Sequence, residues 1–103
     1  MFSVNNRIFV KKGMGYAIAP YFTADQALLK WEGFKKVEVH VCSDNEEHDE
    51  LNVLMYWETL PQFEMWRASD DFKAAHQRDQ AATGESPILK SEIIISEIVS
   101  VLG

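Results

Sequence analysis

The sequence predicts a single α+β domain in which helices cover one face of a four-stranded antiparallel sheet. Three observations lead to this fold class. The chain has 103 residues, which is enough for one domain. Its composition, 47% hydrophobic and 25% charged, is typical of a globular protein with its own core. Alternating and helical segments follow one another as strand, helix, strand, strand, two short helices and strand.

The N-terminal part of the chain predicts two strands with a helical region between them. Residues 2–10 alternate between two faces, which is typical of a strand. Residues 14–30 carry an imperfect apolar stripe and predict a helix. Pro20 should kink or divide that helix, because proline lacks a backbone donor and crowds the preceding turn. Gly33 suits the exit turn, and residues 34–42 then alternate valines with polar side chains as a second strand.

A hairpin and two short helices are expected next. The polar segment 43–50 predicts a loop, and 51–58 predicts the third strand. Thr59 and Gln62 have the spacing of a capping box, which predicts a helix beginning there. Ser69 followed by two aspartates predicts the start of a second helix, because acidic residues stabilise a helix N-terminus.

The C-terminal part predicts a loop over 80–90 and a last strand over 91–102. The whole order is the ferredoxin-like pattern. The last strand is apolar on both sides over much of its length, and residues 54–57 of the third strand look similar. An apolar sheet face in so small a chain favours a second subunit that covers it, so we expect a homodimer that packs sheet on sheet.

Charge and composition exclude several functional classes. The chain has 10 basic and 16 acidic residues, a net charge of −6, which argues against nucleic-acid binding and against an anionic membrane surface. No stretch approaches ~18 consecutive apolar residues. The N-terminal segment lacks the basic-then-apolar pattern of a secretion signal, so we expect a cytoplasmic protein. From its length we expect one domain over 1–103. A single cysteine, Cys42, provides no internal disulfide.

Asn6 is a polar residue in an apolar position. It lies midway along the first predicted strand, on the face that also carries Val4 and Ile8. A buried amide without a partner costs about 1–3 kcal/mol. Asn6 is therefore either a structural amide bonded to neighbouring backbone or a polar group directed into a ligand cavity.

His76 and Trp66 each have two possible roles. His76 shares a helix face with Phe72 and follows two alanines, which leave the helix surface flat. It is either an exposed histidine near a helix C-terminus or the axial ligand of a planar metal macrocycle. Trp66 is either a core residue or a rigid wall of a pocket.

Together these residues, on this strand order, resemble the IsdG-type haem-degrading monooxygenases, within the antibiotic-biosynthesis-monooxygenase-like group of the dimeric α/β-barrel superfamily. The resemblance covers essentially the whole chain. The matching segments are Asn6-Arg7, Glu32-Gly33-Phe34, Asp49-Glu50, Trp57 to Ser69 with Phe63 and Trp66, Phe72-Lys73-Ala74-Ala75-His76 and Ser86-Pro87-Ile88.

The resemblance implies an enzyme for which haem is both substrate and cofactor. His76 would be the proximal ligand of the haem iron, and Asn6 would hydrogen-bond iron-bound oxygen on the distal side. Trp66 would press on the porphyrin and ruffle it. The reaction would use O2 and electrons from a reductase or a small reductant, and it would release iron and a linear tetrapyrrole. Two subunits would together form an α/β barrel.

The two haem propionates require local positive charge in a protein whose net charge is −6. Lys73 and Arg78 flank His76, and Phe72 lies one turn before it. We expect these three residues at the haem site, although the two basic side chains are also compatible with a solvated surface. The alternatives to a haem-degrading enzyme are a cofactor-free oxygenase of the same superfamily acting on an aromatic or quinol substrate, and a non-enzymatic haem-binding protein.

Overall fold

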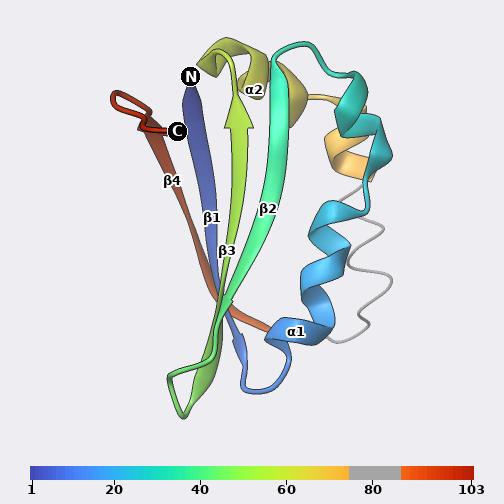
Figure 1. The fold of residues 1–103 in the computed structure, drawn as a ribbon. Coiled ribbons are helices and arrows are strands. Elements are labelled where there is room, and N and C mark those ends of the chain that lie inside the picture. The colour runs from blue at the N-terminus through green and yellow to red at the C-terminus, as the bar shows by residue number, and fades with distance from the viewer. Residues whose placement is uncertain (75–86) are drawn as a thin grey trace.

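Four antiparallel strands form one sheet in the order β2-β3-β1-β4 (Figure 1). The computed structural model describes residues 1–74 and 87–103. The strands are β1 (Phe2–Lys11), β2 (Phe34–Cys42), β3 (His48–Trp57) and β4 (Ile88–Glu97). The described helices lie on one side of the sheet (Figure 1). The predicted fold class is confirmed, because this strand order and this layering define the ferredoxin-like architecture.

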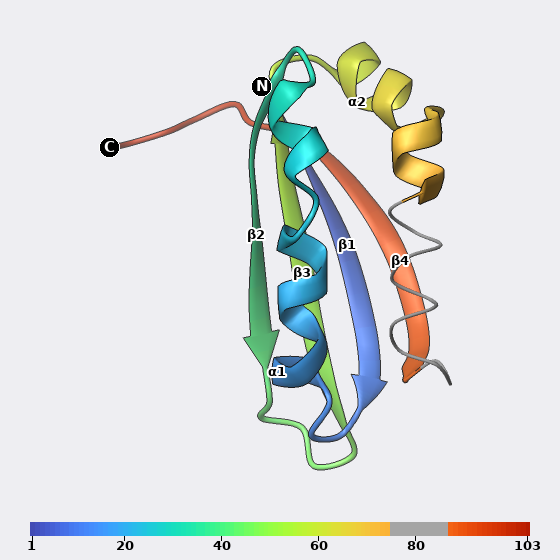
Figure 2. The same ribbon diagram turned by 90° about the vertical axis from the view of Figure 1, so that its right-hand side faces the viewer.

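The helical region between β1 and β2 is divided into three short pieces rather than one helix over 14–30. These are α1 (Gly15–Ile18) and the 3-10 helices η1 (Ala19–Thr23) and η2 (Gln26–Lys30), which lie along the sheet (Figure 2). Pro20 lies in the first turn of η1, where its missing N–H leaves no bond unmade. Asp25 then begins η2, since its side chain accepts the Ala27 N–H at 3.1 Å.

Both predicted helix starts after β3 are confirmed. The helix α2 (Leu60–Arg67) begins with a capping box, in which the Gln62 side chain accepts the Thr59 N–H at 3.1 Å. Residues 70–74 are helical again. There the hydroxyl of Ser69 accepts the Phe72 N–H at 3.2 Å, so Ser69 caps this helical segment.

Two predicted strand boundaries were wrong. β3 begins at His48 rather than at residue 51, because the long β1 continues to pair as far as Lys11. β4 spans Ile88–Glu97 instead of 91–102, and β1 pairs along that length as well. The partner strand therefore determines where each strand ends. The expected loop over 80–90 falls in part on β4, and its residues 80–86 lie outside the described residues.

The start of β3 contains a buried carboxylate that the sequence did not reveal. Asp49 is 1% exposed, and its Oδ2 accepts the backbone N–H groups of Gly13 and Gly15, each at 3.0 Å. Lys12 lies 3.3 Å from the other carboxylate oxygen. A Cβ on Gly15 would lie 3.0 Å from side-chain atoms of both Asp49 and Val41, so a larger residue here would press on both side chains. Asp49 therefore joins the β1–α1 turn to β3.

Replacing Asp49 by alanine is expected to lower the melting temperature by several degrees at pH 7. The pKa of Asp49 is held below its ordinary value, mainly by the hydrogen bond from the Gly15 N–H and to a lesser extent by Lys12 and the Gly13 N–H. Burial acts in the opposite direction and raises this pKa. A lowered folded-state pKa contributes stability above the ordinary pKa near ~4, and this stability is lost as the pH falls through the folded-state value. In thermal melts followed by circular dichroism, the difference in melting temperature between the two proteins should therefore shrink as the pH falls from 7 to 3. The exposed Asp44→Ala is the control, and an equal effect of both variants would contradict the anchoring role.

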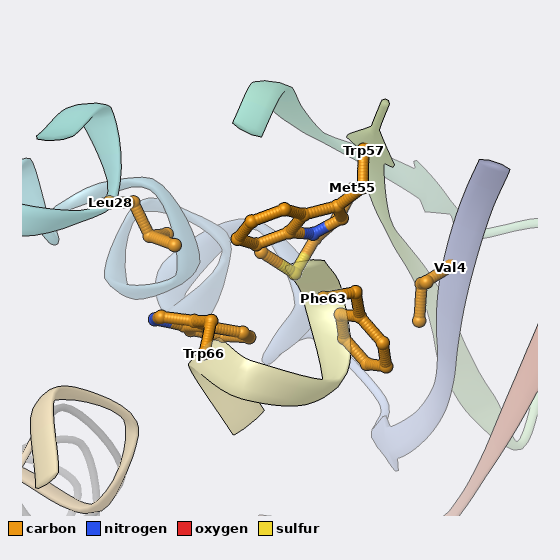
Figure 3. Packing of buried hydrophobic residues seen from close by; sticks show 6 residues of the cluster. All are labelled: Val4, Leu28, Met55, Trp57, Phe63 and Trp66. Atoms are coloured by element: carbon orange, nitrogen blue, oxygen red, sulfur yellow. The ribbon is translucent and has the colours of Figure 1, made fainter. Parts of the chain in front are cut away.

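The core lies between the helices and the inner face of the sheet. Around α2 it contains six buried side chains, which Figure 3 shows packed together: Val4, Leu28, Met55, Trp57, Phe63 and Trp66. A second buried cluster lies toward α1 and consists of Ile8, Val10, Ile18, Leu51 and Val53. The alternation predicted for residues 2–10 is confirmed, since Val4, Ile8 and Val10 are all buried.

The outer face of the sheet is more polar than expected. Arg7 lies 2.8 Å from Glu50 and 3.3 Å from Glu92, so ion pairs connect three strands across this face. The Arg7 guanidinium, followed by a hydrogen bond from Asn52, holds the pKa of Glu50 below its ordinary value. In β4, Ile93 pairs with Asn6 and Ile95 pairs with Val4. Both isoleucines therefore lie on the inner face of the sheet, the face to which Val4 and Asn6 belong. The expectation of a doubly apolar sheet was therefore wrong for much of this face.

Candidate active site

A cavity of about 330 Å³ lies between the helical elements and the inner face of the sheet. This volume is at the lower end of the ~300–1,000 Å³ typical of ligand sites. Most of its lining is apolar or aromatic, with a few polar groups. The described lining residues are Val4, Asn6, Tyr21, Phe22, Ala24, Asp25, Leu28, Val37, Val53, Met55, Phe63, Trp66, Arg67, Phe72, Ser91 and Ile93.

Asn6 brings an amide into this apolar lining from the middle of β1. Its neighbours across the sheet are Val53 on β3 and Ile93 on β4, and both also line the cavity. The Asn6 Oδ1 is buried and has no hydrogen-bond partner among the residues that the structure describes. A buried amide oxygen without a partner is costly unless a ligand or water satisfies it. This geometry favours the cavity hypothesis over a structural amide bonded to neighbouring backbone.

Trp66 belongs to the core and to the cavity at the same time. It is 7% exposed, and its ring centroid lies 5.9 Å from that of Trp57 and 6.2 Å from that of Phe63. Figure 3 shows the rings of Trp57 and Trp66 on facing elements, β3 and α2. Phe72 packs edge-on against Trp66 with ring centroids 5.0 Å apart. The two roles considered for Trp66 are therefore compatible, because one face of a core side chain can form a pocket wall.

A hydrogen bond from a residue 40 positions earlier in the chain attaches the helical segment 70–74 to the rest of the fold. Trp31, in the turn after η2, donates its indole N–H to Asp71 at 3.0 Å. Phe72 lines the cavity, and its place at a haem site stays a prediction. Lys73, expected at the haem site, is exposed and is not part of the cavity lining. His76 and Arg78 lie outside the described residues, so their roles stay predictions.

Several lining residues were not predicted as site residues. Tyr21, Phe22 and Leu28 belong to the apolar stripe of the first helical region, so the stripe itself was the available signal. Arg67 directly follows Trp66 and ends α2. Met65, between Phe63 and Trp66, is 66% exposed. Phe63 and Trp66 share a helix face at a spacing of three residues, and residue 65 falls off that face.

Two further features of the described residues bear on the class of site. Within residues 1–74 and 87–103, no group of three or more histidine, cysteine, aspartate or glutamate side chains could hold a metal ion. In the same part of the chain, no helix is long and apolar enough to cross a membrane.

The fold agrees with comparisons to known proteins. The sequence profile of the antibiotic biosynthesis monooxygenase family matches residues 1–78. The chain is 42% identical over 103 residues to a Staphylococcus haemolyticus protein named heme oxygenase (staphylobilin-producing), with 99% of each chain covered. It is 36% identical to a Staphylococcus saprophyticus protein of the same name, again with 99% of each chain covered. The solved structure of the heme-degrader MhuD from Mycobacterium tuberculosis matches with a TM-score of 0.77 at 20% identity, and all of both chains is covered.

The chain therefore belongs to the antibiotic biosynthesis monooxygenase family, and within it to the group that contains the staphylobilin-producing heme oxygenases. This agrees with the resemblance found in the sequence.

Proposed function

We propose that this protein is a haem-degrading monooxygenase, which opens the porphyrin with O2 and external electrons and releases iron and a linear tetrapyrrole. The observation that carries the proposal is the 42% identity, over 99% of the chain, to a staphylobilin-producing heme oxygenase. The cavity supports it, because a large apolar macrocycle needs an apolar, aromatic lining with few polar groups. The electrons come from a reductase or a small reductant.

The residues fit haem. His76 is the proposed ligand of the iron, and the aromatic side chains of Trp66 and Phe72 form one wall of the cavity. When bound, haem supplies both the iron that activates oxygen and the ring that is oxidised. The amide of Asn6 enters the apolar lining, and its buried Oδ1 has no protein partner within the described residues. Asn6 is thus available to hydrogen-bond reacting groups, while the aromatic wall excludes water and limits how the ring can lie.

Haem titration followed by aerobic reduction tests the function. We expect a sharp Soret band that saturates at one haem per chain. Adding a reductant in air should then remove the band and release iron, which a ferrous chelator detects. Binding without degradation would indicate a haem-binding protein instead. No binding at all would leave the cofactor-free oxygenase, and assays on aromatic and quinol substrates would then follow.

Asn6→Ala is expected to slow haem degradation about 10²-fold while the affinity for haem changes little. The reason is that a polar group directed at the reacting atoms contributes mainly in the transition state. Single-turnover decay of the Soret band measures the rate, and titration measures the affinity. Asn45→Ala, in the exposed 43–47 loop, is the matched control. Unchanged turnover in Asn6→Ala would remove Asn6 from the reaction.

We propose that the working unit is a homodimer formed through the outer face of the sheet, and that it acts in the cytoplasm. Leu54 and Ile94 flank Asn5 on that face, and Ile94 is 43% exposed. Beyond β4, Val99 and Leu102 are 86% and 102% exposed. Apolar side chains this exposed favour burial against a second copy. Elution at the size of a monomer in gel filtration would contradict the dimer.

A further inference from the structure

Arg67 lies at the border between the cavity and solvent. It is the last residue of α2, it lines the cavity beside Trp66, and it is nevertheless exposed. A residue that both lines a cavity and meets water lies at its mouth. Among the described lining residues, Arg67 is the only one with a cationic side chain.

Arg67 has no protein anion to neutralise it within the described part of the chain. The ion pairs there involve Arg7, Lys12, Lys35, Lys36 and His40, but not Arg67. The protein as a whole has a net charge of −6, which disfavours the approach of an anion. The described lining also contains one acidic residue, Asp25, so Arg67 offsets the unfavourable charge at this site and is the group there that can attract an anion.

We propose that Arg67 binds a carboxylate of the ligand in the cavity. The inference rests on the proposed function, under which this carboxylate is a haem propionate. The planar guanidinium donates two parallel hydrogen bonds to a carboxylate, a geometry that lysine does not offer. The macrocycle then lies against the apolar lining while its acidic edge points toward solvent. Arg67 takes the role that the sequence suggested for Lys73, which does not line the cavity.

The test compares haem with its dimethyl ester, in which both propionates are uncharged. Each is titrated at low salt into the wild type, Arg67→Gln, Arg67→Lys and Lys30→Gln. Lys30→Gln is the control, because it removes the same charge from an exposed residue that is not part of the cavity lining. We expect Arg67→Gln to raise the Kd for haem about three- to tenfold, as for a partly exposed charge-assisted contact. Its Kd for the diester should equal that of the wild type, and Arg67→Lys should recover part of the loss.

The outcomes separate this assignment from the proposed function. Equal losses for haem and the diester in Arg67→Gln would mean that the residue acts on the shape of the cavity, which overturns the assignment. Equal losses in Arg67→Gln and Lys30→Gln would show a general charge effect and overturn it as well. If the wild type and Arg67→Gln bind haem with the same Kd, the assignment is overturned and the proposed function stands. A wild type that binds no haem overturns the proposed function and the assignment together. Lys73→Gln, titrated in parallel, tests the residue first suggested by the sequence.

Discussion

Replacing His76 by alanine is expected to abolish the saturable Soret band and, with it, haem degradation. The chain has three histidines, and the other two lie away from the cavity. His40 is exposed on β2 and lies 3.3 Å from Glu38, while His48 packs edge-on against Phe9 with ring centroids 5.1 Å apart. Neither lines the cavity. His76 is therefore the histidine that we propose as the iron ligand, in the role that the resemblance implies.

The measurement is a haem titration of His76→Ala with His40→Ala as the matched control. His40→Ala should bind haem as the wild type does. Free imidazole added to His76→Ala should restore a Soret band, because it can occupy the position of the missing side chain. If His76→Ala binds haem with unchanged affinity and spectrum, the assignment of the ligand is wrong, although haem binding itself could stand.

Trp66→Ala is expected to lower the free energy of unfolding by about 3–5 kcal/mol, as is typical when a buried large aromatic side chain is truncated. This is a large fraction of the ~5–15 kcal/mol that stabilises an ordinary domain. The reason is the position of Trp66 among Trp57, Phe63 and Phe72. Urea denaturation measures the effect. The neighbouring Met65→Ala, at a residue 66% exposed, should change stability by at most about 0.5 kcal/mol.

Because Trp66→Ala disturbs the fold, the role of the Trp66 side chain in haem degradation is tested with Trp66→Phe. Phenylalanine keeps an aromatic ring in the core but is smaller, so the wall of the cavity recedes. We expect a much smaller loss of stability than with alanine, an almost unchanged affinity for haem and a slower degradation. A Trp66→Phe enzyme that degrades haem at the wild-type rate would show that Trp66 serves packing alone.

Local patterns in the sequence predicted the sheet and part of the site. Alternation along residues 2–10 placed Asn6 on the inner face, because successive side chains of a strand point to opposite sides. The capping residues Thr59 and Ser69 predicted where helices begin, since they act on backbone groups within one turn. The helix repeat also groups Phe63 with Trp66, and both belong to the buried cluster.

What remained unpredicted depends on partners that are distant in the chain. Asp49 stands in a run of polar residues, and only the turn at Gly13 and Gly15, 36 and 34 residues earlier, buries it. The extent of β4 follows from the length of β1 rather than from its own alternation.

The amino-acid sequence by itself determined the fold class, the position of Asn6 and the aromatic character of the pocket, because these follow from periodicity and capping within short segments. Only the tertiary structure distinguished Arg67 from Lys73. Arg67 and Lys73 look alike in the sequence, but the end of α2 places Arg67 at the cavity mouth and leaves Lys73 in solvent. Electrostatic recognition depends on where a charge lies in space, and packing between distant segments determines that position.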